Sequence, residues 1–225
     1  MDGLIRKGRF SILEKKFEVN SINININKRL GLFGMLGILQ EVGTVHAENM
    51  GVGMEEMIRR NAFWVFTQQT LRMNRWPRWQ DRVTVKTWVR KINGMRSYRD
   101  YTIHLGDELI GKSVGTFMML DGETRKPVRP EFSENIEKQI SGKELDITPD
   151  KIVAPDNLEL VNTISVRNSD LDMNNHVNNT KYAQWILDSV KLDYHKRYVV
   201  SEFDINFISE CRLGDDIEIY LSIDE

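Results

Sequence analysis

The sequence predicts an α+β fold built from two similar units in tandem, each an antiparallel sheet wrapped around a central helix. In this chain of 225 residues, the order of a strand, a long helix and further strands occurs twice. Four of the five prolines lie in one stretch between the two occurrences. A shift of the first half by 134 positions also superposes apolar residues, because Leu71, Met73, Val83 and Val85 fall on Ile205, Phe207, Ile217 and Ile219.

The first unit is expected to span residues 1–125. Apolar residues at alternate positions predict a strand from Phe17 to Ile26. Apolar residues near helical spacing predict a helix from about Leu32 to Ala47. Long strands are then expected at Trp64–Asn74, Arg82–Lys91, Arg96–Leu105 and Leu109–Leu120.

Residues 126–157 are expected to form a linker, because this stretch is rich in Pro, Glu, Asp and Lys and has little apolar periodicity. One short helix is predicted within it, near Glu134–Ile140. The second unit, residues 158–225, repeats the order of the first, with a strand at Leu158–Arg167, a helix at about Thr180–Tyr194 and strands at Val199–Ile208 and Asp216–Ile223.

The match between the halves has a simpler alternative, since all amphipathic strands share a period of two residues. If the repeat is real, the shift of 134 carries the first unit's last two strands beyond residue 225. The second unit is therefore expected to be truncated and to lack those strands.

Composition excludes several classes of protein. A lone cysteine, Cys211, rules out an intrachain disulfide and a cysteine-rich zinc site, and the four histidines have no metal-ligand spacing. We therefore expect no metal and no cofactor. The N-terminal residues resemble neither a signal peptide nor a transit peptide, and no apolar run reaches 18 residues, so a cytoplasmic protein without a membrane span is predicted.

The stretch SDLDMNNHVNNTKYAQW, residues 169–185, is the most informative for chemistry. Asp172, Asn174 and His176 alternate, so in an extended segment they would project to one side and could polarise water and a carbonyl group. Asn178 or Asn179 is expected to cap the helix that follows, and the amides near residues 177–179 would then offer a site for an oxyanion. The alternative is a polar turn followed by a helix cap.

This run resembles the active-site motif of the plant and bacterial acyl-ACP thioesterases, which fold as two tandem hot-dog units. Glu210-Cys211 in FISECRLGDD resembles that family's Glu-Cys pair, and the stretches GVGMEEMIRRNAFWVFTQ and NGMRSYRDY resemble its N-terminal unit. The resemblance covers nearly the whole chain. It implies catalytic roles for Asp172, Asn174, His176 and Glu210, and it implies that the first unit supplies the acyl pocket.

The first unit has no counterpart to the polar trio. Its matching junction reads NINKRLGLFG and offers Asn27 but no His or Asp. We therefore expect the first unit to be non-catalytic, with the acyl chain measured along its helix. Replacing Gly34 or Gly37 by Leu is expected to shorten the preferred acyl chain.

Cys211 is an alternative nucleophile, because a Cys–His–Asn set is chemically sensible. A lone cysteine is more often a small buried hydrophobic residue, however. Cys211 and Glu210 would also point in opposite directions in an extended segment, so Glu210 is preferred.

From residue 59 to residue 99 there are eleven basic residues and a single acid, Asp81. Acyl carrier proteins are acidic, so a basic face could orient one. The residues proposed for carrier binding are Arg59, Arg60, Arg75, Arg78 and Arg96. The alternative is a set of solvated strand faces that lie apart after folding. Nucleic acid is not favoured, because no binding motif accompanies Trp76 and Trp79.

The function expected is hydrolysis of a fatty acyl-ACP thioester to a free fatty acid and the carrier thiol, which would end chain elongation in fatty acid biosynthesis. Glu210 or Asp172 would be the base toward water, or Asp172 would attack through an anhydride. The alternatives are an acyl-CoA thioesterase and a non-catalytic acyl-binding protein of the same fold. The partner expected is an acyl carrier protein bearing a fatty acyl chain, and a homodimer is left open.

Overall fold

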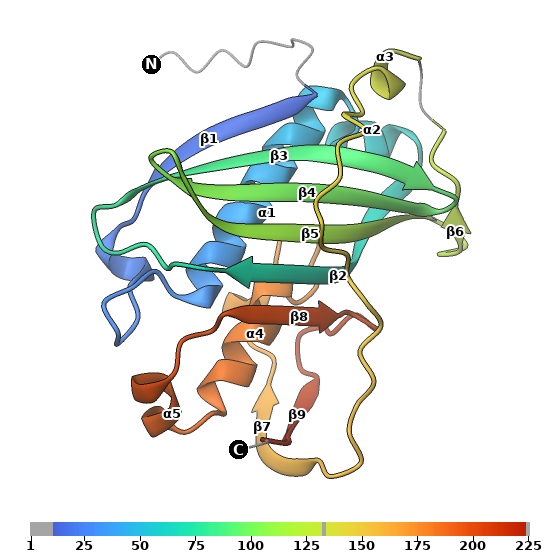
Figure 1. The fold of residues 1–225 in the computed structure, drawn as a ribbon. Coiled ribbons are helices and arrows are strands. Elements are labelled where there is room, and N and C mark those ends of the chain that lie inside the picture. Colours follow the sequence, from blue (N-terminus) through green and yellow to red (C-terminus); the bar gives the residue numbers. More distant parts are fainter. Residues whose placement is uncertain (1–10, 132–133, 224–225) are drawn as a thin grey trace.

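The computed structural model describes residues 11–131 and 134–223. In the first unit, one antiparallel sheet curves around a long central helix, α1, at Leu32–Met50 (Figure 1). Its strands run in the order β1-β3-β4-β5-β2, and the short strand β6 pairs with β5. Their bounds are Ile12–Glu18 for β1, Ala62–Met73 for β2, Arg82–Asn93 for β3, Arg96–Leu105 for β4, Glu108–Asp121 for β5 and Pro127–Val128 for β6.

The apolar face of α1 forms the main core. Met35, Leu39 and Val42 are fully buried against inward-facing side chains of the sheet such as Val85 and Ile103. Each such side chain contributes about 1.5–3 kcal/mol by leaving water. Gly51, with φ 75°, ends the helix in the left-handed conformation that glycine adopts without strain. A short helix, α2, follows at Met54–Arg59 and was not predicted.

The second unit repeats these elements in shorter form. Its strands are β7 at Glu159–Ser165, β8 at Glu202–Asn206 and β9 at Asp216–Leu221, and its helices are α4 at Asn179–Asp188 and α5 at Leu192–Arg197. β8 pairs with β2 and so extends the first unit's sheet, whereas β7 and β9 pair with each other. In the first unit's sheet, β4 and β5 lie between β3 and β2, whose counterparts in the second unit are β9 and β8. Among the described residues, no strands take the place of β4 and β5 in the second unit.

The repeat is visible residue by residue. β1, the 3-10 turn at Ser21–Asn23 and α1 begin at residues 12, 21 and 32, and their counterparts begin 147 residues later, at 159, 168 and 179. After the helices, the shift falls to 134, because α4 is much shorter than α1. In the β2–β8 ladder, Thr70 lies opposite Asp204, its own counterpart at that shift, so an approximate two-fold axis passes through this pair.

The predicted strand at Phe17–Ile26 is wrong. The strand is β1, Ile12–Glu18, and residues 21–23 form a 3-10 turn instead. Alternating Ile and Asn imitated a strand, but Ile22 is 90% exposed. The Asn25 side chain accepts hydrogen bonds from the amides of Asn27 and Arg29, and these local bonds close a loop.

Other boundaries also differ from expectation. The helix expected at Thr180–Tyr194 is broken after Asp188 into α4 and α5. The helix α3, Glu134–Glu137, is shorter than predicted, and the strand expected at Val199–Ile208 narrows to β8. No helix of the described residues is both long enough and apolar enough to cross a membrane.

Part of the predicted linker packs across the outer face of the first sheet, where the chain passes in front of β3–β5 (Figure 1). Arg90 and Asp100 lie buried beneath it as an ion pair, with Nε and Oδ1 3.0 Å apart. Arg90 also donates to the carbonyl of Ile147 at 3.0 Å, and the Leu145 amide donates to Asp100 at 2.8 Å. These bonds fix the segment around residues 145–147 to the sheet.

Candidate active site

The polar trio lies in a tight turn before α4, not in the extended segment expected from its spacing. The Asp172 amide donates to the His176 carbonyl at 2.8 Å, and Asn175 adopts φ 59°. Asp172 Oδ1 accepts the amides of Asn174 at 2.8 Å and His176 at 3.4 Å. The turn still brings all three side chains to one cavity, because Asp172, Asn174 and His176 all line it.

Asn178 caps α4, as one of the two alternatives predicted. Its Oδ1 accepts from the Thr180 amide at 3.0 Å and from the Thr180 hydroxyl at 2.8 Å. Two of the amides expected to bind an oxyanion are occupied, however. Val177 donates to the Cys211 carbonyl and Asn178 to the Asp170 carbonyl, each at 2.9 Å. Within the described chain, the Asn179 amide is the one of the three that has no acceptor.

Glu210 reaches the trio from the segment between β8 and β9. Its Oε2 lies 3.5 Å from His176 Nε2, and both side chains are about three-quarters buried. Arg125, in the turn between β5 and β6, donates to the same oxygen at 2.6 Å. Sequence reasoning missed Arg125, because it lies at the polar edge of the predicted linker. An arginine of the first unit thus holds a carboxylate of the second.

Cys211 faces away from the cavity that Glu210 lines. It packs into the second unit's core with Val177 and Ile219. Burial and a hydrogen bond with Cys211 raise the pKa of the neighbouring Tyr182 phenol. This placement favours Glu210 over Cys211 as the reacting group.

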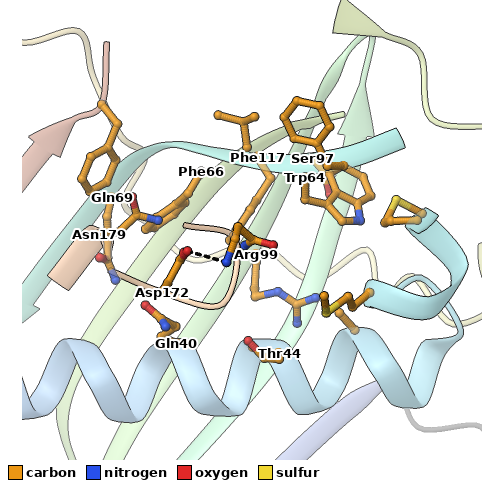
Figure 2. Close-up of a pocket in the computed structure, with 18 of the residues that line it drawn as sticks. Gln40, Thr44, Trp64, Phe66, Gln69, Ser97, Arg99, Phe117, Asp172 and Asn179 are labelled. Carbon is orange, nitrogen blue, oxygen red and sulfur yellow. Dashed lines mark hydrogen bonds between the residues drawn. The ribbon is translucent and has the colours of Figure 1, made fainter. Parts of the chain in front are cut away.

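One cavity of about 910 Å³ joins the two units. At one end lie Asp172, His176 and Glu210, and the rest is lined mainly by apolar side chains of the first unit, among them Leu36, Met57, Trp64, Phe66, Val89, Phe117 and Ile136. Figure 2 shows Asp172 across from Gln40 of α1, with the aromatic rings of Phe66, Phe117 and Trp64 on the sheet side. This volume is of the size that holds a drug-sized or fatty ligand.

A group of buried polar side chains interrupts the apolar wall. Arg99 and Tyr101 on β4 are 7% and 3% exposed, and both line the cavity. Arg99 Nη1 lies 2.6 Å from His46 Nδ1 and 3.5 Å from the Thr87 hydroxyl. Burial lowers the pKa of the Arg99 guanidinium and raises that of the Tyr101 phenol to about 12.

The basic stretch does not form one face. Arg90 and Arg99 are buried on opposite faces of the sheet. Arg59 and Arg60 precede β2 and both pair with Glu56, whereas Arg75 and Arg78 follow β2. β2 has 12 residues, which places the two groups about 40 Å apart. Arg96 lies at the turn between β3 and β4 and is exposed. The five proposed carrier-binding arginines therefore fall into two separate groups.

The first unit contains a turn with the same hydrogen bonds but different side chains. At the shift of 147, Asn25, Asn27 and Arg29 stand in place of Asp172, Asn174 and His176, and at the shift of 134 Trp76 replaces Glu210. The hydrogen bonds match: Asn25 Oδ1 accepts the Asn27 amide at 3.0 Å and the Arg29 amide at 3.3 Å. This turn contains no carboxylate and no histidine, which agrees with a non-catalytic unit.

The described residues hold no cluster of three or more His, Cys, Asp or Glu that could bind a metal ion. What the candidate site does hold is two carboxylates, an imidazole and an amide that line one largely apolar cavity. Such a set can activate water and polarise a carbonyl group of a ligand with an apolar tail.

Comparisons with known proteins agree with this arrangement. The chain is 26% identical over 229 residues to an acyl-[acyl-carrier-protein] hydrolase of Cuphea viscosissima, covering 93% of this chain and 54% of that protein. It is also 26% identical to an oleoyl-acyl carrier protein thioesterase of Coriandrum sativum, covering 91% of this chain and 61% of that protein. The chain thus spans about half to three-fifths of the length of these relatives.

The fold is similar to that of a crystal structure of an acyl-ACP thioesterase from Bacteroides thetaiotaomicron. The TM-score is 0.86 at 23% identity, and the match covers 92% of this chain and 85% of that one. The acyl-ACP thioesterase N-terminal domain matches residues 11–136, and the C-terminal domain of the same family matches residues 153–225. The chain therefore belongs to the acyl-ACP thioesterase family.

Proposed function

We propose that this protein hydrolyses fatty acyl-ACP thioesters to free fatty acid and carrier thiol, in the service of fatty acid synthesis. The observation that carries the proposal is the single cavity that joins Asp172, His176 and Glu210 to the apolar interior of the first unit. Family membership supports the same reaction. We propose the unit bounds 1–125 and 158–225, with the linker 126–157. A cytoplasmic location is also part of the proposal.

In the proposed reaction, the acyl chain fills the first unit and the thioester lies at the turn before α4. Asp172 Oδ1 is occupied by two amides of the turn, whereas Oδ2 has no partner among the described residues and is available to a water or to the thioester carbon. His176, beside Glu210, can carry the proton between water and the leaving thiol. The geometry supports either carboxylate as base, and direct attack by Asp172 remains the alternative route.

The amide of Asn179 is the proposed donor to the oxyanion. It lies in the first turn of α4, where the helix dipole also favours negative charge. Asn179 lines the cavity, and Figure 2 shows its side chain beside the ligand space on the same side as Asp172. Asn174, which is exposed at the mouth, would contact the thioester or the carrier arm.

The carrier protein is proposed to dock at the end of the sheet near α2. Met54 and Ile58 of α2 line the cavity and are exposed, and Arg59 beside them is also exposed. Arg60 and Arg96 lie toward the same end, so these three arginines are the better candidates for contact with an acidic carrier. Arg75 and Arg78 lie at the far end, so we propose no role for them in docking.

The test is turnover of purified protein on a panel of acyl-ACPs from C8 to C18, with the matching acyl-CoAs in parallel. Hydrolysis of acyl-ACP at a kcat/KM well above that for acyl-CoA supports the proposal. Faster turnover of acyl-CoA would favour a CoA thioesterase, and tight binding of both without turnover would favour an acyl-binding protein.

A further inference from the structure

Two buried arginines lie on neighbouring strands of the first sheet, and their surroundings differ. Arg90, on the outer face, donates to both oxygens of Asp100 at 3.0 and 3.2 Å and to the Ile147 carbonyl. Arg99, on the inner face, has no carboxylate within 4.0 Å among the residues that the structure describes. Both side chains are more than nine-tenths buried.

The donors of Arg99 are only partly used. A guanidinium can only donate, so His46 Nδ1 must be the acceptor of the 2.6 Å contact with Nη1. The Thr87 hydroxyl, at 3.5 Å from the same Nη1 atom, is a weak second partner. The Nε and Nη2 atoms have no acceptor in the described part of the chain. A buried cation in this state is costly unless an oxygen from outside the protein completes its hydrogen bonds.

The free side of Arg99 adjoins the ligand space. Arg99 lines the cavity together with Gln40, Thr44, Ser97 and Tyr101. Gln40 lies across from Asp172, and Thr44 lies one helical turn further along α1, where Figure 2 shows Arg99 between the helix and the sheet. The strand order β3-β4-β5-β2-β8 places Arg99, on β4, between Glu210, which follows β8, and Val89 on β3. A chain that enters past Asp172 and Glu210 and crosses the sheet therefore meets Arg99 before Val89.

We propose that the cavity selects acyl chains that carry an oxygen acceptor part-way along, with the guanidinium of Arg99 as the group that binds this oxygen. The acceptor would be a hydroxyl, a keto oxygen or a second carboxylate. The proposal rests on the proposed function, because it names the substrate class of the same site. A purely saturated chain leaves the Arg99 donors unpaired, whereas an oxygenated chain satisfies them.

The test uses binding probes without a thioester or a free headgroup carboxylate. Methyl dodecanoate is compared with its hydroxyl- and keto-bearing positional isomers and with monomethyl dodecanedioate, by titration calorimetry on the full chain. At least one oxygenated probe should bind roughly tenfold to a hundredfold more tightly than methyl dodecanoate, as expected for a hydrogen bond to a charged group. A preference for the diacid ester identifies a carboxylate, and a preference for an isomer identifies a neutral oxygen.

Three variants test whether Arg99 causes the preference for oxygenated probes. Arg99→Met should abolish it, Arg99→Lys should weaken it, and Arg82→Met, at an exposed arginine on the neighbouring strand β3, should leave it unchanged. Arg99→Met should also melt no lower than the parent. If it does not fold, the parent and Arg99→Lys titrations decide the question. Equal affinity for plain and oxygenated probes in the parent, or a preference that survives in Arg99→Met, overturns the proposal.

Hydrolysis of acyl-ACP is measured separately on the same protein. If no acyl-ACP is hydrolysed but the binding preference holds, the proposed function fails and the inference about the ligand stands. If saturated acyl-ACPs are hydrolysed as well as oxygenated ones and no probe is preferred, the inference fails and the proposed function stands.

Discussion

Asp172 has a counterpart in the first unit, and the comparison separates two roles of its side chain. Asn25 accepts the same pair of turn amides that Asp172 accepts, so the turn needs an oxygen acceptor but no charge. The carboxylate of Asp172 is therefore in excess of what the turn requires. A substitution that keeps the acceptor and removes the charge tests chemistry without disturbing the turn.

Glu210 and Cys211 are adjacent in sequence but occupy different environments. Glu210 lines the cavity beside His176, and Cys211 packs into the core. We expect Glu210→Gln to lower kcat roughly a hundredfold, as for loss of a positioned acid–base group, and Cys211→Ala to keep most activity. Steady-state turnover on one acyl-ACP measures both. A correctly folded but inactive Cys211→Ala would instead indicate a thiol nucleophile.

Asp172, Asn174 and His176 were open to prediction from sequence because they lie in one short run that resembles the family motif, and Glu210 because it stands in a Glu-Cys pair that also resembles the family. The geometry of the trio could not be predicted. The alternation of Asp172, Asn174 and His176 suggested an extended segment, whereas Asn175 adopts a positive φ and the chain turns there. Arg99 is one of the eleven basic residues between positions 59 and 99, and charge alone does not indicate which face of a strand such a residue occupies. In the structure, Arg99 shares the inner face of β4 with Ser97 and Tyr101, which also line the cavity.

At the scale of elements, α1 lines the cavity, but not through Gly34 and Gly37, the glycines singled out in the sequence. A side chain at Gly34 would meet Leu30 and Asn23, and Gly37 faces open space, so neither points into the cavity. Leu36, Gln40, Thr44 and Ala47 line it instead. The expectation for Gly34 and Gly37 is therefore wrong.

Ala47 is the residue of α1 at which we now predict an effect on chain length, because it lines the cavity. Ala47→Leu adds bulk beyond Thr44 and should shift the preference toward shorter chains, by roughly fourfold for each methylene excluded. The measurement is the ratio of kcat/KM on C8, C12 and C16 acyl-ACP. Gly37→Leu is the matched control on the same helix and should keep the parent's ratios. If Ala47→Leu also keeps them, α1 does not limit chain length.

The outer face of the sheet depends on the Arg90–Asp100 pair. Burial raises the pKa of Asp100, and the hydrogen bond from Arg90 opposes that shift. Arg90→Met would leave a buried, unpaired carboxylate and should lower the free energy of unfolding by about 3–5 kcal/mol. The loss should shrink as the pH falls, because the protonated form of Asp100 is neutral and tolerates burial.

Urea unfolding at several pH values measures this loss. The double variant Arg90→Met/Asp100→Leu is the control, because an apolar pair of similar size should recover much of the stability. A pH-independent loss that persists in the double variant would show that Arg90 acts through the carbonyls of residues 145 and 147 alone.

At the scale of the whole molecule, the two units are joined by the β2–β8 ladder near Thr70 and Asp204. The sequence revealed the repeat after the helices, where the shift is 134. The residue-by-residue match before the helices, where the shift is 147, was not found from the sequence, because α1 and α4 differ in length. The cavity that crosses the unit boundary could not be predicted, since it depends on how the turn of one unit faces the helix of the other.

The central claim is that the second unit supplies the chemistry and the first unit holds the acyl chain. Fatty acid release from dodecanoyl-ACP by Asp172→Asn, compared with the parent, tests it most directly. The account predicts a loss of at least roughly a hundredfold in kcat, with an unchanged melting temperature and unchanged binding of the acyl chain. Turnover close to that of the parent in this variant would contradict the account.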